Sequence, residues 1–158
     1  MKAVVQALRG PFEHSCSLVA DYIDKCPDAI WTEKNGGWPV WQQIAHTLAV
    51  MDFFSDAPGR EPLAPPCSVE TAMLKHQGAD LVSKDAMKAY MGKVKARADA
   101  WLDSLDDGAL AAVNAHISGK MGRDMANGAL VVMLSSHTQY HVGSCDAALR
   151  DHGLPGVF

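Results

Sequence analysis

One segment constrains the fold most, because its apolar residues repeat at the spacing of a packed helix. Within residues 87–105 the apolar side chains are separated by 4, 3, 4, 3 and 4 positions; they are Met87, Met91, Val94, Ala98, Trp101 and Leu105. This spacing places them in one seam along a helix and is typical of left-handed helix packing. Such a seam must be covered by other helices. The sequence therefore predicts a bundle of helices.

Three further long helices are predicted to pack with the first. Residues 12–26 carry apolar positions at helical spacing, and this helix either begins near Pro11 or extends upstream with a kink. A second helix is predicted to begin at Trp38-Pro39, and it is apolar almost all round, which indicates burial on most sides. The last long helix is expected over residues 127–151, where glycine and proline then act as stop signals.

The segments between these helices show weak or irregular patterns. Residues 57–66 are proline-rich and predict a loop, and residues 69–75 predict a short helix. Residues 114–128 hold three glycines among polar residues and predict a loop or extended excursion. No segment is a convincing strand. We therefore expect an all-α fold, a single domain over residues 1–158, built as a four-helix bundle with a long connection between its second and third helices.

Composition excludes several classes of protein. Apolar residues make up 48% of the chain and charged residues 20%, as in ordinary soluble domains. The net charge is −4 and no basic run could neutralise a row of phosphates, so we expect no nucleic-acid partner. No apolar run approaches membrane-spanning length, and no membrane association is expected. The cysteines show no CxxC spacing and are typical of reduced thiols in a cytoplasmic protein; they are Cys16, Cys26, Cys67 and Cys145.

Three histidines are predicted to face the interior of the bundle. His137 and His141 are four residues apart, so they share one face of the last helix. With seven histidines in 158 residues, chance gives roughly 0.3 such pairs. The spacing alone is therefore weak evidence for a metal site. The pair shares its sector with apolar residues, however, while the opposite side carries more polar residues such as Thr138 and Asp146. His46 lies beside apolar residues on the second helix and is also predicted to point inward.

The number and type of inward-facing ligand residues distinguish a metal site from the alternatives. A single inward histidine is more often a hydrogen-bonded core residue than a ligand. Three together leave several buried donors and acceptors to satisfy, each costing about 1–3 kcal/mol if unpaired, and one divalent cation satisfies them together. The chain has no Glu-x-x-His and no His-Glu-x-x-His, which disfavours a di-iron bundle and excludes a zincin. The regular stripe of the third helix has no ionisable group other than the nearby Tyr90, so ligands are expected from helices two and four.

Two segments together resemble a known family. Residues 37–46, GWPVWQQIAH, look like the start of the second helix in DinB/YfiT-like proteins, and residues 137–143, HTQYHVG, look like their His-x-x-x-His-x-Gly signature. The resemblance covers about residues 12–153. It implies a four-helix bundle, a divalent metal, commonly zinc or nickel, held by His46, His137 and His141, and a homodimer. Ser144 departs from the glutamine that often follows this signature.

The residues and the resemblance lead to competing functional hypotheses. Three histidines leave a coordination position open, as in catalytic rather than structural zinc sites. The leading hypothesis is a metal-dependent enzyme, hydrolase-like or thiol S-transferase-like, acting on a small molecule with a low-molecular-weight thiol as one candidate partner. The alternative is a non-catalytic, stress-related metal-binding or assembly module. A metal-free bundle is the third reading.

Other residues are secondary candidates for the pocket. His14 on the first helix could face it, although a surface position is the commoner outcome for such a histidine. Ser144 and Cys145 follow the signature and are candidates for the surroundings of the metal, with an inert buried thiol as the default for Cys145. The remaining histidines are predicted to have solvent-exposed roles; they are His76, His116 and His152.

Overall fold

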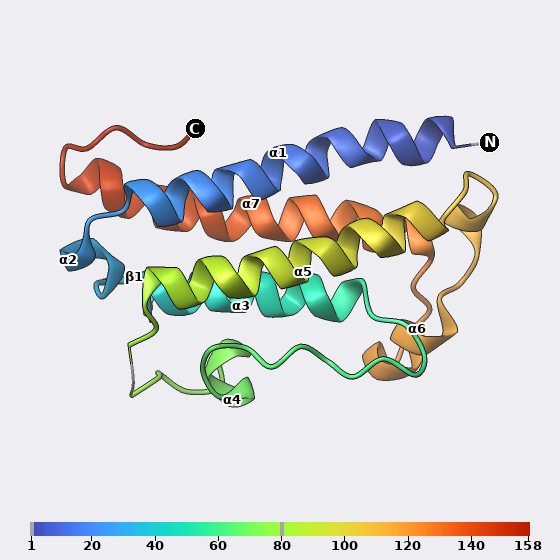
Figure 1. Ribbon diagram of the computed structural model, residues 1–158, viewed down its shortest axis with the longest axis horizontal. Helices are drawn as coiled ribbons and strands as arrows, with labels where there is room; N and C mark the ends of the chain where they lie inside the picture. Colours follow the sequence, from blue (N-terminus) through green and yellow to red (C-terminus); the bar gives the residue numbers. More distant parts are fainter. Residues whose placement is uncertain (1, 80) are drawn as a thin grey trace.

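The computed structural model describes residues 2–79 and 81–158. Four long helices run side by side (Figure 1), and they are α1 (Ala3–Lys25), α3 (Val40–Phe54), α5 (Lys84–Ser104) and α7 (Asn127–Asp151). The shorter elements are α2 (Asp28–Trp31), β1 (Lys34–Asn35), β2 (Trp38–Pro39), α4 (Val69–Ala72), the 3-10 helix η1 (Ala109–Ala111) and α6 (Ala115–Met121). This confirms the all-α fold.

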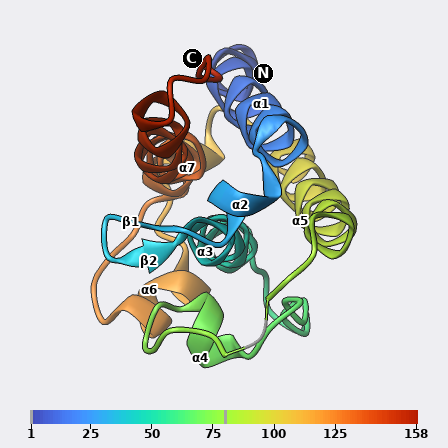
Figure 2. The same ribbon diagram turned by 90° about the vertical axis from the view of Figure 1, so that its left-hand side faces the viewer.

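The four long helices enclose one core. Viewed end on, α3 lies between α5 and α7, and α1 closes the other side (Figure 2). Neighbouring pairs in contact are α1 with α7, α3 with α7, α3 with α5 and α1 with α5. The long connection between α3 and α5 carries α4 beneath α3, as Figure 1 also shows. In the part of the chain that the structure describes, every helix is too short or too polar to cross a membrane.

The α5 seam lies in the core as predicted. Met87, Val94 and Ala98 are fully buried, whereas Met91 is half-buried. The helix begins after Ser83, whose side-chain oxygen accepts a hydrogen bond from the backbone N–H of Ala86. The apolar period therefore identified both the element and its buried face.

The first helix is longer than its apolar pattern suggested. α1 begins at Ala3 and continues through Pro11, so the upstream extension is the correct alternative. Val5 is fully buried, and the backbone N–H groups of Val4 and Val5 donate to the Asp107 carboxylate at 2.9 and 3.1 Å. Asp107 follows α5 in the chain. A residue about one hundred positions away thus satisfies donors that the helix itself leaves unpaired.

The prediction of a loop or extended excursion over residues 114–128 was wrong for residues 115–121, which form α6. The Asn114 side chain accepts a hydrogen bond from the Ile117 N–H at 3.0 Å and caps the helix. Ile117 is fully buried, and Gly122 ends the helix with a positive φ of 67°. One buried side chain and a cap stabilise this helix, which the glycine content of the segment made hard to predict from the sequence.

Two element boundaries also differ from expectation. Trp38-Pro39 does not begin the second long helix; it forms β2, paired antiparallel with β1, and α3 begins one residue later at Val40. The short helix predicted over residues 69–75 ends at Ala72. Leu74 adopts a positive φ of 55°, and this left-handed conformation cannot continue a right-handed helix.

The polar side of α7 does not face solvent. Thr138 and Asp146 are 1% and 4% exposed, because α7 packs against α1 on this side and against α3 on the other. The Thr138 hydroxyl donates to the Leu134 carbonyl, and the Asp146 carboxylate accepts from Val157 N–H and Arg150 Nε. The prediction of one inward stripe was therefore too simple: α7 is buried toward both α1 and α3, and its exposed side carries Val132 and Tyr140.

Candidate metal centre

Three histidine rings meet where α3 contacts α7. The ring centroids of His46 and His137 are 5.2 Å apart, those of His46 and His141 are 4.8 Å apart, and those of His137 and His141 are 4.6 Å apart. One nitrogen from each ring can be chosen so that all three lie within 4.8 Å of one another. Because α3 and α7 lie side by side (Figure 2), His46 and His137, which are 91 positions apart in the chain, belong to one cluster.

A backbone carbonyl orients His46. Its Nδ1 lies 2.9 Å from the carbonyl oxygen of Ala72, at the end of α4. A carbonyl only accepts hydrogen bonds, so Nδ1 carries the proton and Nε2 keeps its lone pair. This is the arrangement that metal-binding histidines generally have, with the second nitrogen held by a carbonyl or carboxylate. His46 is thus set to offer Nε2 to a cation.

His141 contains a buried nitrogen without a partner. The residue is 8% exposed, and its Nδ1 makes no hydrogen bond within the described part of the chain. Leaving such an atom unpaired costs about 1–3 kcal/mol. A cation bound by this nitrogen would remove that cost. The residues present therefore fit a metal ion.

Burial keeps the three rings neutral. It lowers the pKa of His137 and of His141 to about 4, with a smaller contribution from charge repulsion by the neighbouring histidines. The pKa of His46 is also lowered by burial, against the opposing effect of its bond to Ala72. At neutral pH each ring therefore has a free lone pair. Neutral imidazoles are ligands that suit zinc, copper, iron and nickel.

Gln42 holds the α4 segment in place beside His46. Its side chain is fully buried, and Nε2 donates to the carbonyls of Thr71 and His76 at 2.9 and 2.8 Å. Its Oε1 accepts from the N–H of Gly78 at 3.0 Å. One side chain on α3 thus fixes the backbone that orients His46. The sequence analysis missed Gln42, since a glutamine on an apolar helix was its only local signal.

The secondary candidates lie elsewhere. His14 is exposed on α1. Ser144 lies against the β1–β2 hairpin, where Asn35 Nδ2 donates to its carbonyl at 2.6 Å. Cys145 is fully buried, and its carbonyl accepts a hydrogen bond from the Tyr22 hydroxyl at 2.9 Å. Neither His14 nor Cys145 belongs to the group of donors formed by the histidines in the described part of the chain.

Aromatic side chains border the histidines. The ring of Tyr140 meets that of His141 edge to face at 5.0 Å, although the tyrosine is 73% exposed. The ring of Phe54 lies 6.5 Å from that of His137. Because His46 and His137 are only half-buried, the cluster is not sealed from solvent.

One of the histidines predicted to be solvent-exposed has a buried partner instead. His116 Nε2 lies 2.9 Å from the Asp56 carboxylate, which also binds Lys120 Nζ at 2.5 Å. Asp56 is 7% exposed. Burial acts to raise the pKa of Asp56, but the hydrogen bonds from Lys120 and His116 outweigh it and lower that pKa. These contacts fasten α6 to the end of α3.

Comparison with known families identifies the family of this chain. The model of the DinB superfamily matches residues 12–145, a range that includes His46, His137 and His141. The chain belongs to the DinB superfamily. Comparisons with curated proteins and with solved structures found no match. For this DinB-superfamily chain, the histidine cluster is a candidate metal site.

Proposed function

We propose that His46, His137 and His141 bind one divalent cation, zinc or nickel, and that the protein is a metal-dependent enzyme acting on a small molecule. The observation that carries this proposal is the convergence of three neutral imidazole nitrogens within 4.8 Å of one another. The unpaired Nδ1 of His141 and the oriented ring of His46 support it.

The chemistry follows from the donor set. Three protein ligands are typical of catalytic zinc, which keeps a further position for water or substrate. When bound, such an ion lowers the pKa of a water or thiol ligand or polarises a carbonyl, which suits a hydrolase or a thiol S-transferase. The chain's own contribution is positioning: Ala72 holds His46, and the shared helix face holds His137 and His141. The half-buried His46 and His137 leave the cluster open to solvent.

The test combines metal analysis with turnover. The purified protein is assayed for zinc and nickel, then screened with low-molecular-weight thiols plus electrophiles and with panels of esters and amides. We expect about one metal per chain and turnover that chelation removes and re-addition restores. Stoichiometric metal without metal-dependent turnover in any panel would contradict the enzymatic role, and absence of metal would favour a metal-free bundle.

A non-catalytic, stress-related metal-binding or assembly module is the second candidate, because the cluster joins α3 and α7 and is tied to α4. In that case the metal acts only as a cross-link between helices. His137→Ala should then lower the melting temperature sharply, and no added thiol should change the spectrum of the cobalt-substituted protein. A thiol that enters the cobalt coordination sphere contradicts the purely structural role.

The cellular context belongs to the same proposal. All four cysteines are free, as expected of a protein in a reducing cytoplasm. A homodimer, implied by the family resemblance, is tested by light scattering during gel filtration. A mass of twice 16.9 kDa supports it, and a single-chain mass contradicts it.

A further inference from the structure

A cavity lies beneath α3, and none of the three histidines lines it. It encloses about 190 Å³ between α3, the α4 segment and α5, and Pro62 and Leu63 of the connection also line it. Its wall is almost entirely apolar and includes Ala49, Phe53 and Met73. None of the metal-site histidines lines it, although Ala72, whose carbonyl orients His46, does.

One polar group in this wall has no hydrogen-bond partner among residues 2–79 and 81–158. Tyr90, on α5, lines the cavity and is 4% exposed. Its pKa is raised by burial and then by the Asp52 carboxylate, and no hydrogen bond to a described residue contributes. Within the described chain the fully enclosed side-chain atoms without a partner are Arg9 Nε and His141 Nδ1. The Tyr90 hydroxyl is not among them, and Tyr90 lines the cavity, so we infer that the hydroxyl borders it.

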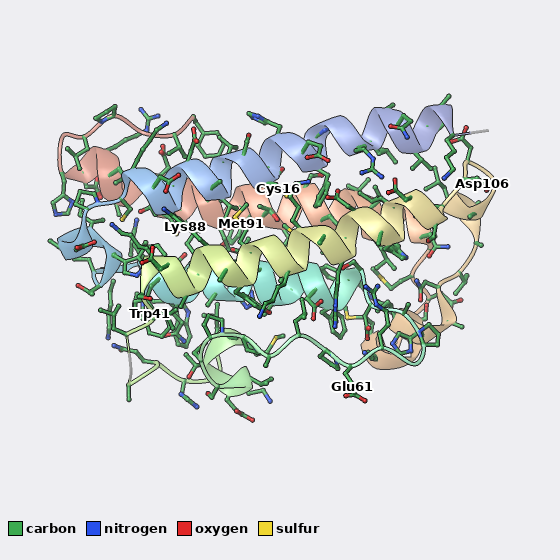
Figure 3. All side chains as sticks on the ribbon, in the orientation of Figure 1. Cys16, Trp41, Glu61, Lys88, Met91 and Asp106 are labelled. Carbon is green, nitrogen blue, oxygen red and sulfur yellow. The ribbon has the colours of Figure 1, made fainter. Side chains whose placement is uncertain are left out.

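The charged groups at the cavity are already paired. Asp52 accepts hydrogen bonds from Arg97 at 3.3 Å and from the Leu63 N–H at 2.9 Å. Asp56 is paired with Lys120 at 2.5 Å. Figure 3 shows Glu61 at the outer edge of the connection, directed away from the bundle. A charged ligand would have to displace one of these pairs, whereas a neutral ligand would not.

We propose that this cavity binds a small neutral molecule with an apolar body and one hydrogen-bonding oxygen, which pairs with the Tyr90 hydroxyl. The size is adequate, since a dry apolar cavity of about 150 Å³ is known to bind benzene. None of the three histidines lines this site, although it shares Ala72 of α4 with the surroundings of His46.

The test uses two probes that differ by one hydroxyl, 4-fluorophenol and fluorobenzene. Fluorine NMR titration of the purified full-length protein measures both dissociation constants. We expect both probes to bind. Tyr90→Phe should lower the ratio of 4-fluorophenol to fluorobenzene affinity by about 2- to 10-fold, the range expected for one hydrogen bond. Tyr140→Phe, which removes an exposed hydroxyl, is the matched control and should leave the ratio unchanged.

Substitutions that fill the cavity test whether the probes bind there. Ala49→Leu should weaken both probes by more than 10-fold, whereas Ala100→Leu, at an exposed position of α5, should weaken neither. Leu63→Trp, in the connection, is a second filling variant if Ala49→Leu does not fold. His141→Ala should retain both affinities. The proposal is overturned if the wild type binds neither probe, if filling has no effect, if Tyr90→Phe keeps the ratio, or if His141→Ala loses binding.

Discussion

The Nδ1 atom of His46 and the carbonyl oxygen of Ala72 lie 2.9 Å apart and join the candidate metal centre to the long connection. This bond is made between residues 26 positions apart, and it decides which nitrogen of His46 is free. The α4 segment is therefore part of the site even though it supplies no ligand. We therefore expect substitutions in the connection to change the metal affinity of the three histidines.

Removal of any one histidine should weaken metal binding strongly. His46→Ala and His141→Ala leave two donors, and we expect the affinity for zinc to fall by at least about 100-fold, more than the 10- to 100-fold typical of losing only a supporting contact. Metal content by mass spectrometry and competition with a chelating dye measure the change. His14→Ala is the control, since His14 is exposed on α1. Equal metal content in all variants would rule out the three-histidine site.

Gln42→Ala should loosen the connection and weaken metal binding indirectly. The change removes two donated hydrogen bonds and one accepted hydrogen bond, and we expect a loss of about 2–4 kcal/mol in the free energy of unfolding. Zinc affinity should fall by about 10-fold, because Ala72 no longer holds His46 firmly. Urea denaturation and dye competition measure the two effects. Gln77→Ala, at an exposed position, should change neither.

Gly78→Ala should destabilise the same segment by overpacking. A Cβ at residue 78 would lie 2.5 Å from Cη2 of Trp41 and 2.7 Å from Cγ2 of Thr71, and Figure 3 shows Trp41 on α3 above the connection. We expect a loss of about 1–3 kcal/mol in the free energy of unfolding. The matched change Gly119→Ala meets no atom within 4 Å in α6 and should stabilise by about 0.5–1 kcal/mol. Thermal denaturation of both variants checks the contrast.

Asp56→Asn should make stability less dependent on pH. The pKa of Asp56 in the folded protein is lowered below its ordinary value of 3.8. The carboxylate therefore stabilises the fold fully above this value, and its contribution disappears as the pH falls through the lowered pKa. At pH 7 we expect the variant to lose about 1–3 kcal/mol, since Lys120 and His116 lose a charged partner. Urea denaturation between pH 7 and pH 3 should show the gap closing at the acid end; a constant gap would contradict it.

Local patterns predicted the long helices well. The seam of α5 and the extent of α7 follow from apolar periodicity, which depends only on residues within a few turns of each other. His46, His137 and His141 were singled out for the same reason, because each replaces an apolar residue on a helix face. The structure brings them together; their role as ligands remains the proposal.

The sequence alone thus determined the four long helices and which histidines point inward, since both properties are local. Tertiary structure decided the rest. It buried Thr138, made a helix of residues 115–121, selected the free nitrogen of His46 and placed Tyr90 in the wall of a cavity. Each of these depends on hydrogen bonds or packing between segments far apart in the chain. Such contacts exist only after the helices have assembled, and no pattern within one segment encodes them.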